Sequence, residues 1–480
     1  MRDIEITVTD CCGYPMPDVS VEIRQLRHHF AFGTSVSHHL LSNPQYTQFF
    51  LDRFEWAVFE NESKWYWNEP SQGQVTYSDA DAMYQICEEN GIPVRGHCIF
   101  WAVENYVQDW VKALSDSELQ IAVDNRLGSA VEHFRDRFVH WDVNNEMLHG
   151  HYFENRLGDS IRPHMFQTAN ALDPDCLLFV NDYNVVSGSE TDAYVQQIQD
   201  LMAQGAPIHG IGAQGHFWGS FSPLIVRARL SKLAQVGLPI WITEFDVAFA
   251  DEYERADNLE AFYGTAFSHP AVEGILMWGF WAGDHWRGPD AAIVNLDWTV
   301  NAAGVRYDSL MTEWTTNAFG ATDSAGVFRV QGFHGTYEVT LMDSLAPTTV
   351  DTILVEPADS AAVFTYSLDV EAGLPWQVPD DGPAVKVLES YPSPMTSAVT
   401  VRLTVPGGGS GGLRRVRVEL FNAAGVRLGV LVDHDLMPGE HTFAWDGQLD
   451  RGKETGAGIL FLRASMDGKC IGTAKIVRIR

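Results

Sequence analysis

Eight apolar stretches recur between residues 29 and 318, and they constrain the fold more than any other feature. Helical spacing of apolar residues appears between them, for example in Ser78–Glu89 and Ser117–Phe134. Eight alternating strands and helices predict an α/β fold, a (β/α)8 TIM barrel. The stretches begin near His29, Phe54, Pro93, Phe138, Cys176, Ile208, Leu238 and Glu273.

Two of these stretches change abruptly from apolar to acidic. FVHWDVNNEMLHG (138–150) reaches Glu146, and LPIWITEFDV (238–247) reaches Glu244 and then Asp246. An unpaired buried charge costs several kcal/mol, so a carboxylate at the end of a buried strand needs an explanation. It either caps a helix or forms an ion pair, or it is a catalytic group at the barrel mouth, where active sites of this fold lie.

The spacing of the two glutamates favours the catalytic interpretation. Glu146 and Glu244 are 98 positions apart. One βα unit of a barrel takes about 31 residues, so the glutamates are expected on strands three apart in the ring. Two carboxylates that face each other across a cleft are the arrangement that glycoside hydrolysis requires. The 15 Trp and 15 Tyr either pack the core or offer flat faces for a sugar ring.

The rest of the chain predicts further β structure. Residues 1–28 alternate apolar and polar about a Gly-Tyr-Pro turn, which predicts a β-hairpin. Residues 319–370 predict a small β domain, expected to pack with that hairpin. Residues 371–385 are rich in Pro, Gly and Asp and are expected to be a linker. Residues 386–480 predict a separate immunoglobulin-like β-sandwich.

Charge and cysteine content exclude several classes of function. The net charge is −31; the residues from Lys386 onward carry 13 basic and 9 acidic groups, and those before it carry 19 and 54. So acidic a surface should repel nucleic acid and anionic membranes. The six cysteines show no CxxC pair and no metal-ligand spacing, so we expect no metal site, no cofactor and no disulfide framework.

Hydropathy indicates no membrane insertion. No apolar run approaches the length of a membrane-spanning helix. The first residues, MRDIEITVTD, lack the basic head and apolar stretch of a signal peptide. If the protein is exported, its leader is therefore expected to be absent from this sequence.

Motifs at the expected strand ends carry a family resemblance. They are FENESKW (59–65), EPSQG (69–73), RGHCIFW (95–101), WDVNNEML (141–148), NDYN (181–184), IGAQGHF (211–217), ITEFD (242–246) and WGFW with DHWR (278–287). In this order, residues 29–318 resemble a glycoside hydrolase family 10 endo-β-1,4-xylanase. The N-terminal stretch and FHGTYEVTL (333–341) resemble extensions of plant-type members. GEHTFAWDG and GAGILFLRA, in residues 386–480, resemble FlgD-type immunoglobulin-like modules.

The resemblance implies a retaining hydrolase of internal β-1,4-xylosidic bonds, with Glu146 as general acid/base and Glu244 as nucleophile. His216 would orient Glu244, with Asp246 behind it, and Asn145 would hold the sugar 2-hydroxyl. Taken singly, a Lys is usually a solvated charge and a His or Trp usually a packed residue; only the ordered set points to a sugar site. The further sugar-binding residues that it implies are Glu60, Asn61, Lys64, His97, Trp101, Gln214, Trp278 and Trp286, with Asp182 in support.

One position departs from the family pattern. A His commonly follows the Trp of the third strand motif, and Ala102 stands there in IFWAVEN. The change removes a donor expected beside the sugar, with water, Glu104 or Asn105 as candidates to fill the space. The histidines outside the quoted roles, His149 among them, are expected to be surface or packing residues.

Two alternative functions are left open by the sequence. One is a non-catalytic carbohydrate-binding or inhibitor protein built on the barrel, and the other is a mixed-specificity β-1,4-glycanase. The expected partner is xylan or xylo-oligosaccharides, bound by a monomer. The expected location is secreted or at the cell surface of a bacterium.

Overall fold

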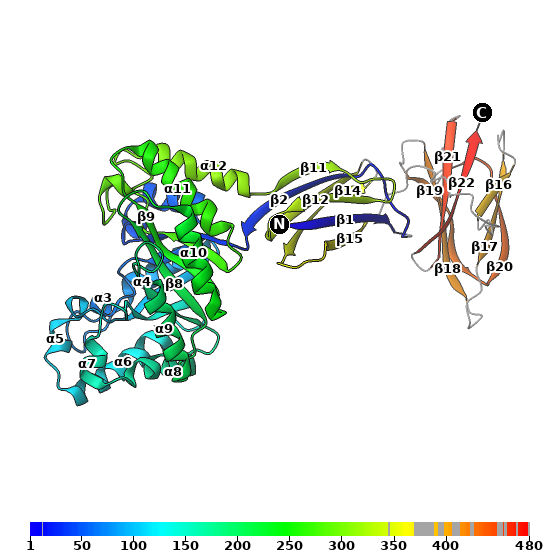
Figure 1. Ribbon diagram of the computed structural model, residues 1–480. Coiled ribbons are helices and arrows are strands. Elements are labelled where there is room, and N and C mark those ends of the chain that lie inside the picture. Colours follow the sequence, from blue (N-terminus) through cyan, green and yellow to red (C-terminus); the bar gives the residue numbers. More distant parts are fainter. Residues whose placement is uncertain are drawn as a thin grey trace. The chain divides into compact units, whose positions relative to one another are not determined.

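The computed structural model describes residues 1–11, 13–343, 346–368, 388–391, 398–405, 413–422, 427–448, 455, 458–466 and 469–478. The chain divides into two compact units. One is residues 27–315, and the other combines residues 1–26 with residues 316–480 (Figure 1). Among the described residues, no helix is both long and apolar enough to cross a membrane.

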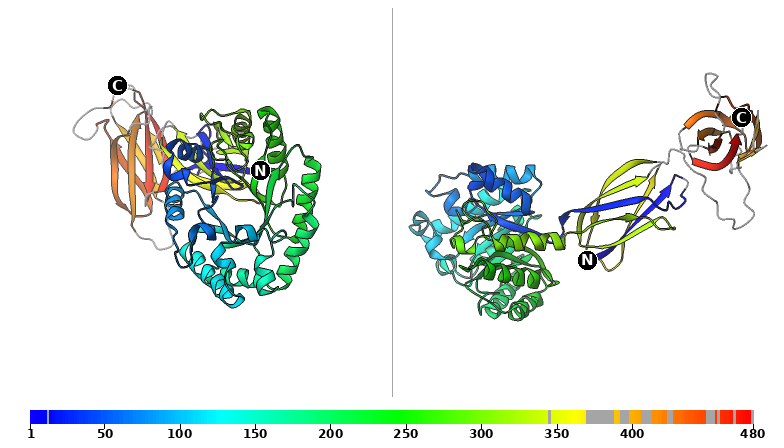
Figure 2. Two further views of the ribbon diagram at one scale, coloured as in Figure 1. Left: turned by 90° about the vertical axis from the view of Figure 1, so that its left-hand side faces the viewer. Right: turned by 90° about the horizontal axis from the view of Figure 1, so that it is seen from above.

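Residues 27–315 form a closed barrel of eight parallel strands, which confirms the predicted TIM-barrel class. Helices surround the strands (Figure 2, left). Strands covered in this way are buried on both faces and read as apolar runs, and every residue of β9 is buried. In ring order the strands are β3 (Ala31–Val36), β4 (Trp56–Phe59), β5 (Val94–Trp101), β6 (Phe138–Asn145), β7 (Leu177–Asp182), β8 (Gly210–Phe217), β9 (Ile240–Val247) and β10 (Val272–Met277).

Capping side chains help to fix where the helices of the barrel begin. The longest, α6, starts with a capping box in which Ser115 and Glu118 satisfy each other's backbone N–H groups. The α-helices are α1 (His39–Ser42), α2 (Pro44–Arg53), α3 (Trp65–Asn68), α4 (Ser78–Glu89), α5 (Asp109–Lys112), α6 (Asp116–His133), α7 (Tyr152–Leu157), α8 (Ile161–Leu172), α9 (Thr191–Ala203), α10 (Pro223–Leu233), α11 (Glu252–Phe267) and α12 (Ala302–Trp314).

The N-terminal strands join strands from residues 317–368 in two sheets. One sheet has the order β12-β1-β15 and the other β11-β2-β13-β14. Their inward-facing apolar residues form one core, to which Ile6, Val21 and Val339 belong. The strands are β1 (Arg2–Asp10), β2 (Ser20–His28), β11 (Asn317–Ala321), β12 (Val327–Gly332), β13 (Gly335–Asp343), β14 (Ala346–Val355) and β15 (Ala362–Leu368).

The predicted N-terminal β-hairpin is wrong. Strand β1 lies between β12 and β15, whereas β2 lies between β11 and β13 in the other sheet. Both strands have one apolar face, and placing them in opposite sheets buries Ile4 and Ile6 of β1 with Val21 and Ile23 of β2 in the shared core. Both segments are strands, as their alternation predicts, but the partner of each comes from more than 280 residues away.

The described residues beyond 387 form two antiparallel sheets around a core of their own, to which Val401, Val418 and Leu462 belong. The predicted linker, residues 371–385, lies outside the described residues. The strands are β16 (Leu388–Tyr391), β17 (Val399–Val405) and β20 (Gly439–Trp445) in one sheet, and β19 (Arg427–Leu436), β18 (Arg414–Asn422), β21 (Gly458–Met466) and β22 (Lys469–Arg478) in the other.

Candidate active site

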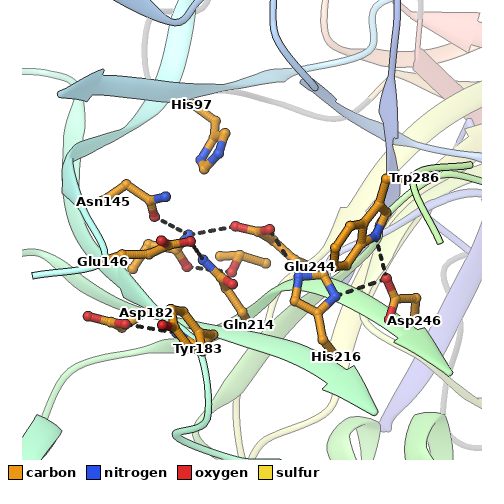
Figure 3. Close-up of polar contacts among 12 residues, drawn as sticks. His97, Asn145, Glu146, Asp182, Tyr183, Gln214, His216, Glu244, Asp246 and Trp286 are labelled. Atoms are coloured by element: carbon orange, nitrogen blue, oxygen red, sulfur yellow. Dashed lines mark hydrogen bonds and ion pairs between the residues drawn. The ribbon is translucent and has the colours of Figure 1, made fainter. Parts of the chain in front are cut away.

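The two glutamates lie at the carboxyl ends of barrel strands. Glu146 directly follows β6, and Glu244 lies near the end of β9. In the ring order, β7 and β8 separate these strands, so the glutamates are on strands three apart, as their spacing predicts. Figure 3 shows both carboxyl groups among the same group of polar side chains.

Glu146 is held in a buried and conformationally unusual position. Its φ is 62°, a left-handed conformation that a non-glycine residue adopts only when its surroundings require it. Its carboxyl group accepts hydrogen bonds from Trp101 Nε1 at 2.7 Å and Gln214 Nε2 at 3.1 Å. The residue is 8% exposed, and burial raises the pKa of Glu146 to about 7 despite these two donors. It can therefore carry a proton near neutral pH.

Glu244 is as deeply buried but is stabilised as a carboxylate. Asn181 Nδ2 donates to Oε1 at 2.8 Å, and His216 Nε2 lies 3.3 Å from Oε2. Burial alone would raise its pKa. The hydrogen bond from His216 and the nearby charges of His97, His216 and Lys64 outweigh burial, and the pKa of Glu244 is lowered below its ordinary value.

His216 is charged because of Asp246. Its Nδ1 lies 2.9 Å from Asp246 Oδ2, which also accepts a hydrogen bond from Trp286 Nε1 at 2.8 Å. Although burial opposes it, the two carboxylates raise the pKa of His216 to about 10. The predicted order of Asp246 behind His216, and His216 beside Glu244, is the arrangement that the structure has (Figure 3).

Asn181 connects the two halves of the site, and no role for it was predicted from the sequence. Its Nδ2 donates to Asn145 Oδ1 at 2.9 Å as well as to Glu244. Thr243 Oγ1 donates in turn to Asn181 Oδ1, which fixes the orientation of the amide. Asn145 Nδ2 is buried and has no hydrogen-bond partner among the described residues, so it is a free donor in the site. The position of Asn181 at a strand end in NDYN was the signal that could have identified it.

Lys64 lies between two of the predicted tryptophans. Its Nζ is 4.5 Å from the ring centre of Trp101 and 5.9 Å from that of Trp278. The Trp278 ring also makes an edge contact with His97, at 5.2 Å between ring centres. Trp286 is the exposed member of the set, whereas Trp278 is buried. The structure thus brings these predicted residues to one end of the barrel.

Glu60 and Asn61 follow β4 and complete the predicted set. Burial raises the pKa of Glu60 to about 7, with the opposing influence of Lys64 and smaller contributions from Asp284 and Glu62. Asn61 Oδ1 accepts a hydrogen bond from Tyr66 Oη at 2.6 Å, which orients its amide.

Asp182 is a supporting residue that positions the His149 ring, which stacks on Tyr183. It accepts hydrogen bonds from Leu148 N and His149 Nδ1, both at 2.7 Å. The His149 ring is stacked on Tyr183, with 3.6 Å between ring centres. His149 lies three residues from Glu146 and packs on Tyr183, which agrees with the packing role expected from the sequence (Figure 3 shows Tyr183).

Ala102 is packed among core residues. It is 2% exposed and belongs to the apolar cluster of the barrel, and its backbone bonds to Asn145 and Tyr152. The ring next to the site at this point is Tyr106, which stacks on Trp101 with 3.6 Å between centres.

No group of three or more His, Cys, Asp or Glu side chains within the described ranges could hold a metal ion. The side chains gathered at the barrel mouth offer two carboxyl groups in opposite environments, amide donors and aromatic faces.

Comparison with known proteins places the barrel in a family context. Residues 23–304 match the model of glycosyl hydrolase family 10. The anti-sigma-I factor RsgI6 of Acetivibrio thermocellus is 52% identical over 340 residues, which cover 71% of this chain and 45% of that protein. Endo-1,4-beta-xylanase 1 of Arabidopsis thaliana is 42% identical over 371 residues, which cover 76% of this chain and 39% of that protein. The chain thus spans less than half the length of these relatives.

Solved structures agree on the fold. The native xylanase 10B from Thermotoga maritima superposes with a TM-score of 0.55 at 23% identity, over 59% of this chain and 95% of that one. Xylanase 10C from Cellvibrio japonicus, solved with xylopentaose, superposes with the same TM-score at 22% identity, over 59% of this chain and 68% of that one. At this identity the likeness concerns the barrel fold.

Proposed function

The chain belongs to glycosyl hydrolase family 10, and from this premise we propose that it is a retaining endo-β-1,4-xylanase. The substrate would be xylan or xylo-oligosaccharides, and the reaction hydrolysis of internal β-1,4-xylosidic bonds. The xylanases of Arabidopsis thaliana among its relatives support this substrate class.

The observation that carries the proposal is the contrast between the two glutamates. Burial raises the pKa of Glu146 to about 7, whereas His216 and neighbouring cations lower the pKa of Glu244. One carboxyl group is thus suited to donate a proton and the other to attack as an anion, which is the division of roles in glycoside hydrolysis.

In the first step, a carboxylate oxygen of Glu244 bonds to the anomeric carbon as the bond from that carbon to the leaving oxygen breaks. Glu146 gives its proton to the leaving oxygen, which departs as a hydroxyl group. The product is a glycosyl ester of Glu244. Asn145 Nδ2, a free donor beside Asn181, is positioned to bind the sugar 2-hydroxyl, a contact that strengthens in the transition state.

In the second step, Glu146, now a carboxylate, takes a proton from water. The water oxygen bonds to the anomeric carbon, and the ester bond to Glu244 breaks. Both glutamates return to their starting states, and one water is consumed. Two inversions at the same carbon give net retention.

Proton NMR of the first products tests this mechanism. The β-anomer should appear first and then mutarotate to the equilibrium mixture. Initial appearance of the α-anomer would mean a single inversion, with Glu244 acting as a base for water instead of as the nucleophile.

A second candidate function has a specific observation in its favour. RsgI6, at 52% identity, is named as an anti-sigma factor and not as an enzyme, which favours the alternative that this barrel is a non-catalytic carbohydrate-binding or inhibitor protein. Both glutamates are present here, which favours catalysis. Calorimetric binding of xylohexaose, measured beside reducing-sugar release, separates the two functions, since a pure binding module binds without release.

Substrate range is the remaining alternative. A mixed-specificity β-1,4-glycanase would also release sugar from cellulose, whereas the Glu60, Asn61 and Lys64 set resembles the xylan-selective pattern. Reducing-sugar release from xylan and from cellulose, compared at equal enzyme concentration, distinguishes a xylanase from a glycanase of broad range.

For the residues beyond 385 we propose an FlgD-like immunoglobulin-like module that acts in sorting or surface attachment. Their two antiparallel sheets and separate core support this assignment. The proposed location is accordingly outside the cell or on its surface, and the proposed state is a monomer.

A further inference from the structure

Two arginines are buried in the barrel close to the candidate active site. Arg95 belongs to β5, and Arg287 follows β10; each side chain is 1% exposed. Each forms an ion pair with a buried aspartate, Arg95 with Asp142 and Arg287 with Asp246. Removing a charge from water is expensive, so these side chains need a reason beyond packing.

Each aspartate also holds a histidine. Asp142 Oδ2 lies 2.8 Å from His97 Nδ1, and Asp246 Oδ2 lies 2.9 Å from His216 Nδ1. Because a carboxylate can only accept, Nδ1 of each ring is the donor, and Nε2 is the atom left for other contacts. The two sets therefore repeat the same order: arginine, aspartate, histidine.

Both histidines act on Glu244. His216 Nε2 lies 3.3 Å from Glu244 Oε2, and an electrostatic contribution from His97 favours the Glu244 carboxylate. Figure 3 shows Glu244 with His97 on one side and His216 on the other. The two sets thus converge on one carboxyl group from different strands.

Each guanidinium group donates a hydrogen bond to its aspartate and lies against an aromatic ring, and Arg95 Nη1 also lies 3.3 Å from His140 Nδ1. The Arg95 guanidinium lies 4.3 Å from the ring centre of Phe179, and that of Arg287 lies 3.6 Å from the ring centre of Trp218. Within the described residues, Nε of both arginines and Nη2 of Arg287 have no hydrogen-bond partner. An apolar residue would usually serve stability better at such a site, so the cost points to function.

We propose that Arg95 and Arg287 are positioning residues for the nucleophile, acting on Glu244 through Asp142 with His97 and through Asp246 with His216. The inference rests on the proposed role of Glu244. Each arginine holds its aspartate in one orientation and balances its charge. The aspartate then fixes the ring orientation of the histidine that faces Glu244, as outer contacts do for the ligands of other reactive centres.

Trp218 has a part in this arrangement. It is 79% exposed and covers the Arg287 guanidinium, so it separates the buried ion pair from water. The other ionisable groups that act on Glu244 are Lys64, Glu60 and Glu146. None of these is changed by a substitution at Arg95, Arg287 or Trp218. The buried His285 interacts electrostatically with Asp246, His216 and Arg287, so it belongs to the second set, and a shift in the behaviour of Glu244 reports on each set as a whole.

The test uses the full chain with Arg287→Gln, Arg287→Lys and Arg95→Lys. The first readout is the rate of covalent inactivation by a 2-deoxy-2-fluoro-xylobioside, which requires attack by Glu244 and little proton donation. The second is the pH dependence of kcat/KM on an aryl xylobioside. Arg287→Gln should slow inactivation about 10- to 100-fold, the loss expected for a hydrogen bond to a charged partner.

The pH profile of kcat/KM shows in which direction the pKa of Glu244 changes. Without the arginine, the Asp246 charge is unbalanced, the carboxylate form of Glu244 is disfavoured, and the acid limb of kcat/KM should move to higher pH. Arg287→Lys restores the charge without the planar fork, so it should return the acid limb toward that of the parent while recovering only part of the rate. Arg95→Lys should slow inactivation by a smaller factor than Arg287→Gln.

Trp218→Ala provides a variant whose folding is not at risk, because the side chain is exposed. It admits water to the ion pair and should shift the acid limb in the same direction by a smaller amount. Arg53→Gln is the matched control. Arg53 also pairs with an aspartate, Asp308 at 3.0 Å, and lies 4.1 Å from a ring centre, that of Phe49, but on α2 and outside the site. It should leave both readouts unchanged.

An unchanged acid limb in Arg287→Gln and Trp218→Ala, with normal inactivation rates, would overturn the positioning role. Equal effects in Arg53→Gln would do the same, since they would indicate general destabilisation. Failure of the proposed function looks different: the parent protein itself would not be inactivated, or the label would be found on a residue other than Glu244.

Discussion

Glu146 and Glu244 carry the same chemical group, and their neighbours give the two groups opposite preferences for a proton. Trp101 and Gln214 donate to Glu146 without overcoming its burial, whereas His216 and Asn181 stabilise the anion of Glu244. At the scale of single residues, the proposed mechanism therefore depends on hydrogen-bond donors and desolvation.

Substitution of each glutamate should have a different signature. Glu244→Gln should abolish turnover of every substrate, because the nucleophile is lost. Glu146→Ala should reduce xylan hydrolysis by about 10²- to 10⁴-fold, the contribution of a general acid, and should largely spare the first step with aryl xylosides whose leaving groups need little protonation. Steady-state and burst kinetics on both substrates measure this. Equal losses at position 146 on activated and unactivated substrates would contradict its assignment.

The pH dependence follows from the opposite pKa shifts of the two glutamates. Because Glu146 must be protonated to act as an acid and its pKa is raised to about 7, kcat/KM should fall as pH rises above about 7. The acid limb should lie below the ordinary range of a glutamate, since the pKa of Glu244 is lowered. The profile of kcat/KM on xylobiosides with poor leaving groups reports both limbs.

Gln214→Ala should move the alkaline limb of the kcat/KM profile to higher pH and lower the rate. Gln214 donates to the Glu146 carboxylate and lowers its pKa, so removing this donor favours the protonated form. Gln196→Ala is a suitable control, because Gln196 bonds to Asp200 on an exposed helix surface. A downward shift in Gln214→Ala would mean that Gln214 acts on Glu146 in another way.

At the scale of the strands and their loops, the segments after β5 and β6 must pass each other closely to place Trp101 beside Glu146. Gly150 makes this possible. A Cβ atom there would lie 2.3 Å from the backbone carbon of Ala102 and from the backbone nitrogen of Val103. The close contact between these two loops therefore leaves no room for a side chain at position 150.

Gly150→Ala should consequently reduce activity and stability together. The added methyl group would push the segment after Trp101 outward, at a cost of about 1–3 kcal/mol in the free energy of unfolding, and weaken the bond from Trp101 to Glu146. Thermal melting and kcat/KM measure the two effects. Gly128→Ala is the control, because a Cβ atom added to Gly128 in α6 would meet nothing within 4 Å; it should raise stability by up to about 1 kcal/mol. A fully active Gly150→Ala protein would show that the loops can separate freely.

At the scale of the whole molecule, the described residues contain separate apolar cores. The barrel, the sheets around Ile6 and Val339, and the sheets around Val401 and Leu462 each bury their own side chains. All residues assigned to the proposed reaction belong to the barrel.

Deletion of residues 386–480 should therefore leave kcat/KM on soluble xylan within about twofold of the parent value, because a domain with its own core folds and acts on its own. If the module serves attachment, the same deletion should change where the protein is found. Hydrolysis of soluble xylan by the two forms, at equal folded concentration, is the measurement. A tenfold loss would mean that the last residues contribute to catalysis.

The barrel and the two glutamates could be predicted from the order of residues alone. Strand and helix periodicities are local, so the barrel can be predicted from them. The carboxyl ends of parallel strands meet at one end of a barrel, so the number of residues between Glu146 and Glu244 was enough to predict that both lie at that end. The roles of His216, Asp246, Lys64 and Trp101 were implied by the resemblance of their motifs to glycosyl hydrolase family 10 and not by spacing.

Which residues touch depended on the folded chain. Asn181 joins Asn145 to Glu244, Arg287 pairs with Asp246, and the backbone of Ala102 lies close to Gly150. Strand β1 likewise pairs with β12 and β15 and not with β2. These contacts join segments distant in sequence, and they depend on strand register and on the close approach of loops. Both are set by the packing of the whole core, which no local pattern of residues encodes.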